Sequence, residues 1–106
     1  ARILVLNVPN LAGLPYVSNR SLDQKRIFQA LAVRFSAQSN AVHGVAGAIV
    51  LDVMCDPRTY IASNYSADGF HPNDAGYVFL ADLVYPAVTS SSAAAPRSSC
   101  PEMARF

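Results

Sequence analysis

The residues best suited to chemistry lie in one short segment that contains Asp68 and His71. Histidine has an ordinary pKa near neutrality, so it can take a proton from a hydroxyl nucleophile and later return it. A carboxylate bonded to its other ring nitrogen fixes the tautomer and stabilises the imidazolium. Asp68 precedes His71 by three residues, with Gly69 between them, so one tight turn can join carboxylate and ring. The spacing predicts a pre-assembled acid–base dyad.

Two apolar runs precede this dyad in the sequence, at residues 3–8 (ILVLNV) and 48–54 (AIVLDVM). Continuous apolar runs, as opposed to alternating ones, suit strands that are buried on both faces of a parallel sheet. Asp52 lies inside the second run and needs a hydrogen-bond partner if it is buried, which the sequence does not name. Catalytic groups of such proteins lie after the carboxyl ends of their strands, where residues 68–77 are expected.

Two helical patterns complete the order of elements. Ser21 and Gln24 have the spacing of a capping box, and apolar residues at helical spacing predict a helix of about twenty residues that stops near Gly44. Its apolar stripe is expected to face the core and consists of Phe28, Leu31 and Phe35. A second helix is predicted from about Asn73 to Tyr85, with Pro86 as its end. Its expected stripe is Val78, Phe79 and Leu83, with Ala75 as a further candidate. Strand, helix and strand predict a βαβ unit with a right-handed crossover.

The run D-G-F-H-P-N-x-x-G-Y at residues 68–77 resembles the last conserved block of the SGNH/GDSL hydrolases, whose signature is D-x-x-H. The layout of residues 1–88 is similar to that family as well. The resemblance implies a three-layer α/β/α fold with a flavodoxin-like parallel sheet, of which this chain supplies the C-terminal half. It also implies a serine esterase or lipase that uses no metal or organic cofactor, in which Asp68 orients the ring of His71 and His71 is the general base.

The other blocks of that family have no match here. No G-D-S segment occurs, and Asn7 lies in a Leu-Asn-Val-Pro context unlike the family's asparagine block. The resemblance implies that an N-terminal fragment of the same enzyme, on a separate chain, supplies the serine and the oxyanion hole for a small ester substrate. Because the chain opens with Ala1-Arg2 and not Met, we expect that an upstream part has been removed.

Other interpretations stay open at this point. His71 could be a helix-start histidine that is bonded to Asp68 without a catalytic role. The whole chain could be a non-catalytic, hydrolase-like assembly or binding module, or two copies could build a continuous sheet. Asp68, His71 and Asp74 are too few ligands for a structural zinc site. Ser66 lacks the sharp strand-to-helix turn of a nucleophile and is expected to be a loop serine.

Composition narrows the class of protein. The chain is 52% hydrophobic and 14% charged, with a formal net charge of +1, and has no basic stripe of the kind that binds nucleic acid. No apolar run is long enough to span a membrane. Residues 89–106 form a Ser/Ala/Pro-rich tail that is expected to be loosely held unless Cys100 fixes it. Cys55 and Cys100 are either a disulfide or two unpaired thiols, and the tail and cysteine pair favour a secreted or periplasmic protein.

Overall fold

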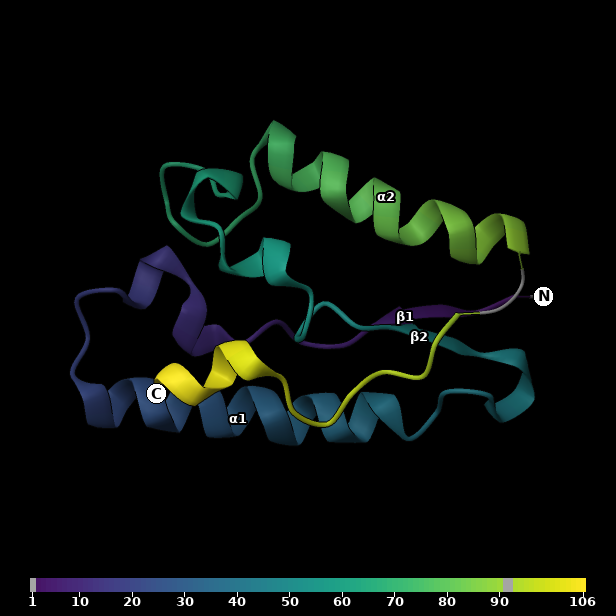
Figure 1. The fold of residues 1–106 in the computed structure, drawn as a ribbon, viewed down its shortest axis with the longest axis horizontal. Helices are drawn as coiled ribbons and strands as arrows, with labels where there is room; N and C mark the ends of the chain where they lie inside the picture. The colour runs from purple at the N-terminus through teal and green to yellow at the C-terminus, as the bar shows by residue number, and fades with distance from the viewer. Residues whose placement is uncertain (1, 91–92) are drawn as a thin grey trace.

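The computed structural model describes residues 2–90 and 93–106. A parallel pair of short strands, β1 (Leu4–Leu6) and β2 (Ile49–Leu51), lies at its centre. Helix α1 (Leu22–Asn40) joins the two strands, and helix α2 (Asp74–Ser90) follows them. The strand pair lies between α1 below and α2 above in Figure 1. The predicted strand–helix–strand order with parallel pairing is therefore confirmed.

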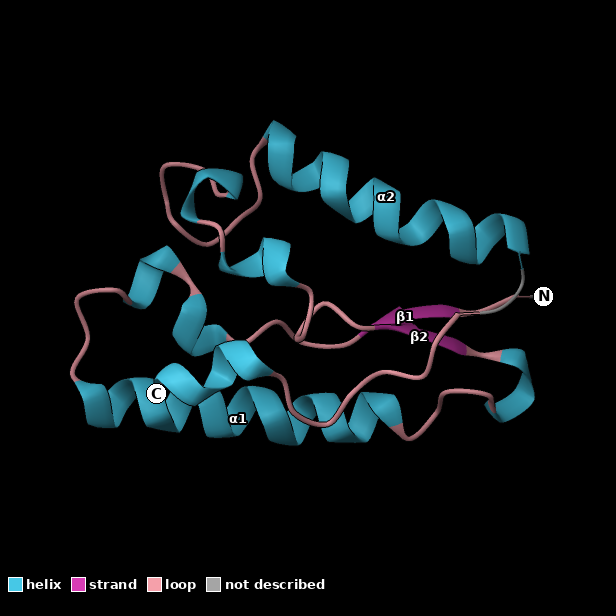
Figure 2. Cartoon of the chain, in the orientation of Figure 1, coloured by secondary structure: helices cyan, strands magenta, loops and turns pink. Residues whose placement is uncertain are grey.

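The predicted three-layer α/β/α fold is wrong. The described residues contain one sheet of two strands, each three residues long, and helices make up most of the regular structure (Figure 2). The apolar runs were read as strands along their whole length, but the ladder stops after Leu6 and Leu51. Beyond it, the side chain of Asn7 accepts the backbone N–H groups of Val53 and Met54, which replaces ladder bonds by side-chain bonds. These residues are buried in a core beneath the tail and not in a sheet.

Helix α1 begins as predicted and buries a different face. Ser21 and Gln24 form the reciprocal capping box. The face that meets the rest of the chain carries the small residues Ala32 and Ser36, and the Ser36 hydroxyl donates to Val8 O at 2.9 Å. The expected stripe does not form the core, because Leu31 is 42% and Phe35 is 59% exposed. Small residues let α1 approach the chain after β1 closely, and the large apolar side chains point elsewhere.

Helix α2 runs through Pro86 to Ser90, so the predicted stop at this proline is wrong. A proline lacks the N–H that would bond the carbonyl four residues earlier, and its ring crowds that carbonyl, but the turns on either side of Pro86 remain helical. Phe79 is buried, and Ala87 packs against Ile49 and Leu51 of β2. Val78 was expected in the buried stripe and is instead exposed. The contact through Ala87 explains why the helix extends this far.

The described part of the tail runs back along α1 and ends in a short 3-10 helix, Pro101–Arg105 (Figure 1). Cys100 and Met103 are buried against Met54 and Cys55. The backbone N–H of Arg97 donates to a carboxylate oxygen of Asp52 at 2.8 Å. The tail therefore closes the buried cluster around Met54 and Cys55. None of the helices in the described residues has the length and apolar character that a membrane span requires.

Candidate acid–base site

Asp68 and His71 lie together on one loop between the second strand and α2. The Asp68 Oδ2 atom is 2.6 Å from the His71 Nδ1 atom, a short charge-assisted hydrogen bond. The side chains are 48% and 66% exposed, respectively. Within residues 2–90 and 93–106, no hydrogen bond reaches the Nε2 atom of His71. The carboxylate thus holds one ring nitrogen of a largely exposed imidazole and leaves the other without a hydrogen-bond partner among the described residues, which is the arrangement a general base requires.

The other carboxylate oxygen of Asp68 is fixed by the backbone. Its Oδ1 atom accepts the N–H of Phe70 at 2.9 Å and the N–H of His71 at 3.0 Å. The hydrogen bond from the His71 ring and these two backbone bonds lower the pKa of Asp68 from 3.8 to about 2. Asp68 therefore stays ionised through the neutral range, as an orienting carboxylate must.

Gly69 makes the turn between acid and base possible. Its φ angle is +69°, and a Cβ atom there would lie 2.7 Å from the backbone nitrogen of Tyr16. That nitrogen instead donates to the carbonyl of Gly69 at 3.0 Å. Both the backbone conformation and the close approach require a residue without a side chain. The turn is thereby docked against a segment more than fifty positions earlier in the sequence.

The base of the loop is closed by bonds between its two ends. Tyr65 and Pro72 form an antiparallel bridge, and the N–H of Ser66 donates to His71 O at 2.8 Å. The Ser66 hydroxyl donates to the Pro72 carbonyl at 3.0 Å. Ser66 therefore directs its proton at the backbone and not at the imidazole, which fits the prediction of a loop serine.

Asn73 and Gly76 set the start of α2 immediately after the dyad. The Asn73 side chain accepts the N–H of Gly76 at 3.0 Å, as an N-cap does, and donates to the carbonyls of Ser63 and Tyr65 at 2.8 and 3.0 Å. A Cβ on Gly76 would lie 2.3 Å from the Asn64 carbonyl oxygen. Asn73 and Gly76, which belong to the same sequence pattern as Asp68 and His71, thus hold the loop against the start of α2.

An apolar cavity of about 400 Å³ reaches the residues on either side of His71 in the chain, although Asp68 and His71 do not line it themselves. Phe70 and Pro72, the neighbours of His71 in the chain, line it together with Tyr65, Phe79 and Leu80. The Phe70 ring meets the imidazole edge-on, with 5.0 Å between the ring centres. A ligand in this cavity would place an apolar group beside the catalytic candidate pair.

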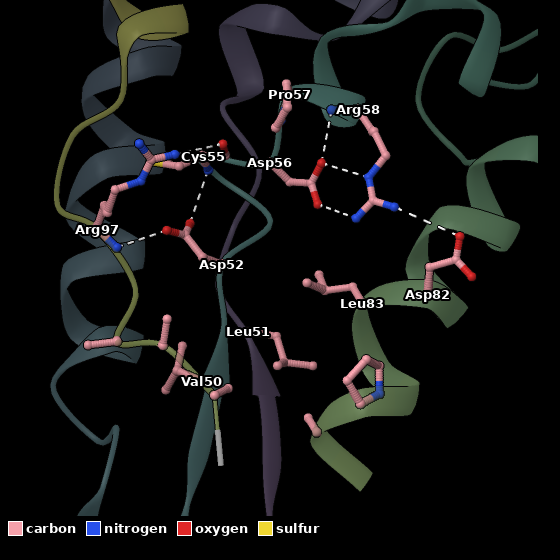
Figure 3. A pocket seen from close by; sticks show the side chains of 15 residues that line it. Val50, Leu51, Asp52, Cys55, Asp56, Pro57, Arg58, Asp82, Leu83 and Arg97 are labelled. Atoms are coloured by element: carbon pink, nitrogen blue, oxygen red, sulfur yellow. Dashed lines mark hydrogen bonds and ion pairs between the residues drawn. The ribbon is translucent and has the colours of Figure 1, made fainter. Parts of the chain in front are cut away.

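A second cavity, of about 480 Å³, lies near the carboxyl end of the second strand (Figure 3). Arg58 borders it and binds both carboxylate oxygens of Asp56, at 2.9 and 2.7 Å. Burial opposes ionisation of Asp56, but the hydrogen bonds and charge of Arg58 outweigh it and lower the pKa of that carboxyl. Arg58 lines this second cavity and not the apolar cavity that Phe70 and Pro72 line.

Asn7 and Asp52 form a buried polar network that the sequence did not reveal as a pair. The Asn7 amide donates to Asp52 Oδ1 and Asn40 Oδ1, each at 3.1 Å, while Asp52 also accepts the N–H of Cys55 at 3.0 Å. Asn7 and the backbone of Cys55 are therefore hydrogen-bond partners of Asp52, which the apolar run around it did not indicate. The only signal in the sequence was a polar residue at the fifth position of each run.

Among the described residues, no cluster of three or more His, Cys, Asp or Glu side chains could hold a metal ion. No family model matches the chain, and comparisons with curated proteins and with solved structures likewise gave no match. The geometry of the loop is therefore the basis for any statement about function.

Proposed function

We propose that Asp68 and His71 are the orienting acid and the general base of a serine-dependent carboxylic-ester hydrolase. The observation that carries the proposal is the 2.6 Å bond from Asp68 Oδ2 to His71 Nδ1, on an imidazole whose side chain is 66% exposed. The D-x-x-H-P-N-x-x-G-Y resemblance supports the same assignment.

The chemistry follows from these positions. His71 Nε2 takes the proton of a serine hydroxyl as its oxygen attacks the ester carbonyl carbon, and Asp68 stabilises the resulting imidazolium. The imidazolium gives this proton to the leaving alcohol when the ester C–O bond breaks. His71 then takes a proton from water, whose oxygen attacks the acyl-enzyme, and returns it to the serine as the carboxylic acid leaves.

The serine is proposed to come from an N-terminal fragment of the same enzyme, since the 106 residues contain no G-D-S segment. The uncovered apolar side chains support a partner of this kind. On α1, Ile27 is 61% and Phe35 is 59% exposed, two turns apart with Leu31 between them. Tyr77 and Val78 are similarly exposed at the start of α2, near the dyad. Large uncovered apolar areas mark surfaces that another polypeptide contacts.

The cavity beside His71 supports an ester with an apolar acyl or alcohol group. Its lining of Phe70, Pro72 and Leu80 offers dispersion contacts and few polar atoms. A small ester with a short hydrocarbon chain would bury that chain against Phe70 and Pro72, the neighbours of His71 in the chain.

The test measures hydrolysis of p-nitrophenyl butyrate by this chain together with its companion polypeptide. His71→Ala is expected to lower kcat/KM by a factor of about 10³–10⁴, because no base remains for the serine. Asp74→Asn, on the first turn of α2, is the matched control and should leave the rate unchanged. A fluorophosphonate probe should label the companion in the wild type and label it far more slowly with His71→Ala.

Two results would count against the proposal. Retention of wild-type hydrolysis by a folded His71→Ala variant would remove His71 from the reaction. Absence of probe labelling on every polypeptide of the complex would favour the alternative of a non-catalytic binding or assembly module.

A further inference from the structure

The two cysteines of the chain meet in one buried cluster, although about 45 residues separate them in the sequence. Cys55 lies just beyond the second strand, and Cys100 lies in the tail, directly before the terminal 3-10 helix. Each side chain is buried, at 2% and 8% relative exposure. Both are free thiols in the structure, and they share this cluster with Met54 and Met103.

The backbone around the pair is held in register by other bonds. The Cys100 thiol lies 3.5 Å from the Met54 carbonyl oxygen, and the Arg97 guanidinium donates to the Cys55 carbonyl at 3.1 Å. Figure 3 shows Arg97 reaching from the tail to Cys55 and its own backbone reaching Asp52. The two bonds of Arg97, to Asp52 and to the Cys55 carbonyl, thus align the tail next to Cys55 without involving either thiol.

We propose that Cys55 and Cys100 form a disulfide that fastens the tail to the body of the protein. The oxidant is a small-molecule disulfide such as oxidised glutathione. One protein thiolate attacks a sulfur of this disulfide and releases one glutathione thiolate; the second protein thiolate then attacks the mixed disulfide and releases the other. Two protein thiols lose two protons and two electrons, and one glutathione disulfide gains the electrons to become two thiols.

The order of the two attacks follows from the surroundings. Burial, aided by the hydrogen bond with Cys100, raises the pKa of the Cys55 thiol, so this residue is a poor first nucleophile in the closed state. Cys100 is on the terminal segment, whose remaining anchors include an exposed bond from Arg26 to the Phe106 carbonyl. Brief release of this segment exposes Cys100 first, and its return delivers the mixed disulfide to Cys55.

The bridge would secure the part of the chain that supports the acid–base loop. The stretch after Cys55 carries the carbonyls of Arg58 and Thr59, which accept bonds from Asn64 and Tyr65 at the base of that loop. Closing a chain segment of this length restricts the unfolded state more than the folded one. The inference does not rest on the proposed hydrolase activity, because it uses only the core contacts.

The test incubates the full chain with oxidised and reduced glutathione, blocks remaining thiols with N-ethylmaleimide, and measures intact mass and a non-reduced peptide map. A single peptide pair linked through Cys55 and Cys100 is expected, with no maleimide added. The oxidised protein should unfold at a temperature about 10 °C or more above that of the reduced protein. Cys100→Ser should abolish this redox-dependent difference.

Met103→Ala is the matched control, because it opens the same buried cluster and keeps both thiols. It should lower the unfolding temperature of both redox forms and preserve the difference between them. Two free, maleimide-reactive thiols after oxidation, or stable glutathione adducts on each cysteine, would overturn the proposal. The peptide map of the wild type decides the matter even if a cysteine variant fails to fold.

Discussion

The side-chain amide of Asn7 lies 3.1 Å from the carboxylate of Asp52, where the two strands of the sheet end. Asn7 also accepts the N–H groups of Val53 and Met54 at 2.9 and 3.0 Å, and it is almost completely buried. One side chain thus ends the ladder of β1 with β2 and fixes the chain that follows it. Asp52 in turn accepts a hydrogen bond from the backbone N–H of Arg97, which connects the tail to the same network.

Asn7→Ala should destabilise the protein by about 2–4 kcal/mol, because it leaves the buried backbone N–H groups of Val53 and Met54 without their acceptor and removes one of the bonds to Asp52. Chemical denaturation measures the change. Asn40→Ala is the control, since Asn40 accepts only one of the Asn7 bonds and is partly exposed. Equal losses for the two variants would show that the network is not the source of the effect.

Gly69→Ala should cost about 2–4 kcal/mol and disturb the Asp68–His71 pair, because the added Cβ meets both an unfavourable φ and backbone atoms. Gly47→Ala provides a matched comparison. Its φ of +79° is nearly the same as the +69° of Gly69, but a Cβ there meets nothing within 4 Å. We expect about 1 kcal/mol for Gly47→Ala, which reflects the backbone conformation alone. If both variants lose the same stability in denaturation, the contact of Gly69 with Tyr16 is not a constraint.

The Asp68 carboxylate should remain ionised until the pH falls to about 2, compared with an ordinary value of 3.8. A carboxyl with a lowered pKa in the folded state contributes stability above pH 3.8, and this contribution is lost as the pH falls through about 2. The carboxyl ¹³C shift of Asp68 follows this titration by NMR. In His71→Ala the midpoint should rise toward 3.8, and the two backbone bonds should keep it from reaching that value. An unchanged midpoint would mean that the ring bond does not form in solution.

Arg58→Lys should destabilise the protein by about 1 kcal/mol, because lysine keeps the charge but cannot form the bidentate hydrogen bonds that arginine makes with the Asp56 carboxylate. Arg58 also stacks over the Phe79 ring, 5.1 Å from its centre, and lysine would weaken this contact as well. Asp82→Asn is the control. Its oxygen lies 3.9 Å from Arg58 and its side chain is 67% exposed, so the change should be below about 0.5 kcal/mol. Thermal unfolding of the two variants distinguishes these values, and a larger loss for Asp82→Asn would contradict the ranking.

Local features of the fold could be predicted from sequence, whereas the extent of the sheet could not. The capping box at Ser21 and the tight turn at Gly69 depend on neighbours within three residues, so the residue types indicate them directly. The ends of β1 and β2 depend on Asn7 meeting residues more than forty positions away. A continuous apolar run gave no sign of that meeting, and the three-layer fold inferred from it is wrong.

The same distinction applies to the candidate site and to α2. The Asp68–His71 contact was predictable because it closes within one turn. Its docking against Tyr16 was not, because no periodicity links the two segments. Pro86 suggested a helix end from its missing N–H, but the packing of Ala87 on the strands outweighs one lost bond.

The three-residue spacing of Asp68 and His71 separates two properties of the pair. One is the orientation of the two side chains relative to each other, and the other is the position of the pair on the protein. Because only three positions separate Asp68 and His71 in the sequence, their contact forms without the closure of a long chain segment. Where the pair stands is decided elsewhere, by the contact of Gly69 with Pro15 and Tyr16. A change in the earlier segment would carry the pair along as one rigid unit and not pull it apart. Substitutions near Pro15 are therefore expected to shift the position of the imidazole on the protein while its bond to the Asp68 carboxylate stays intact.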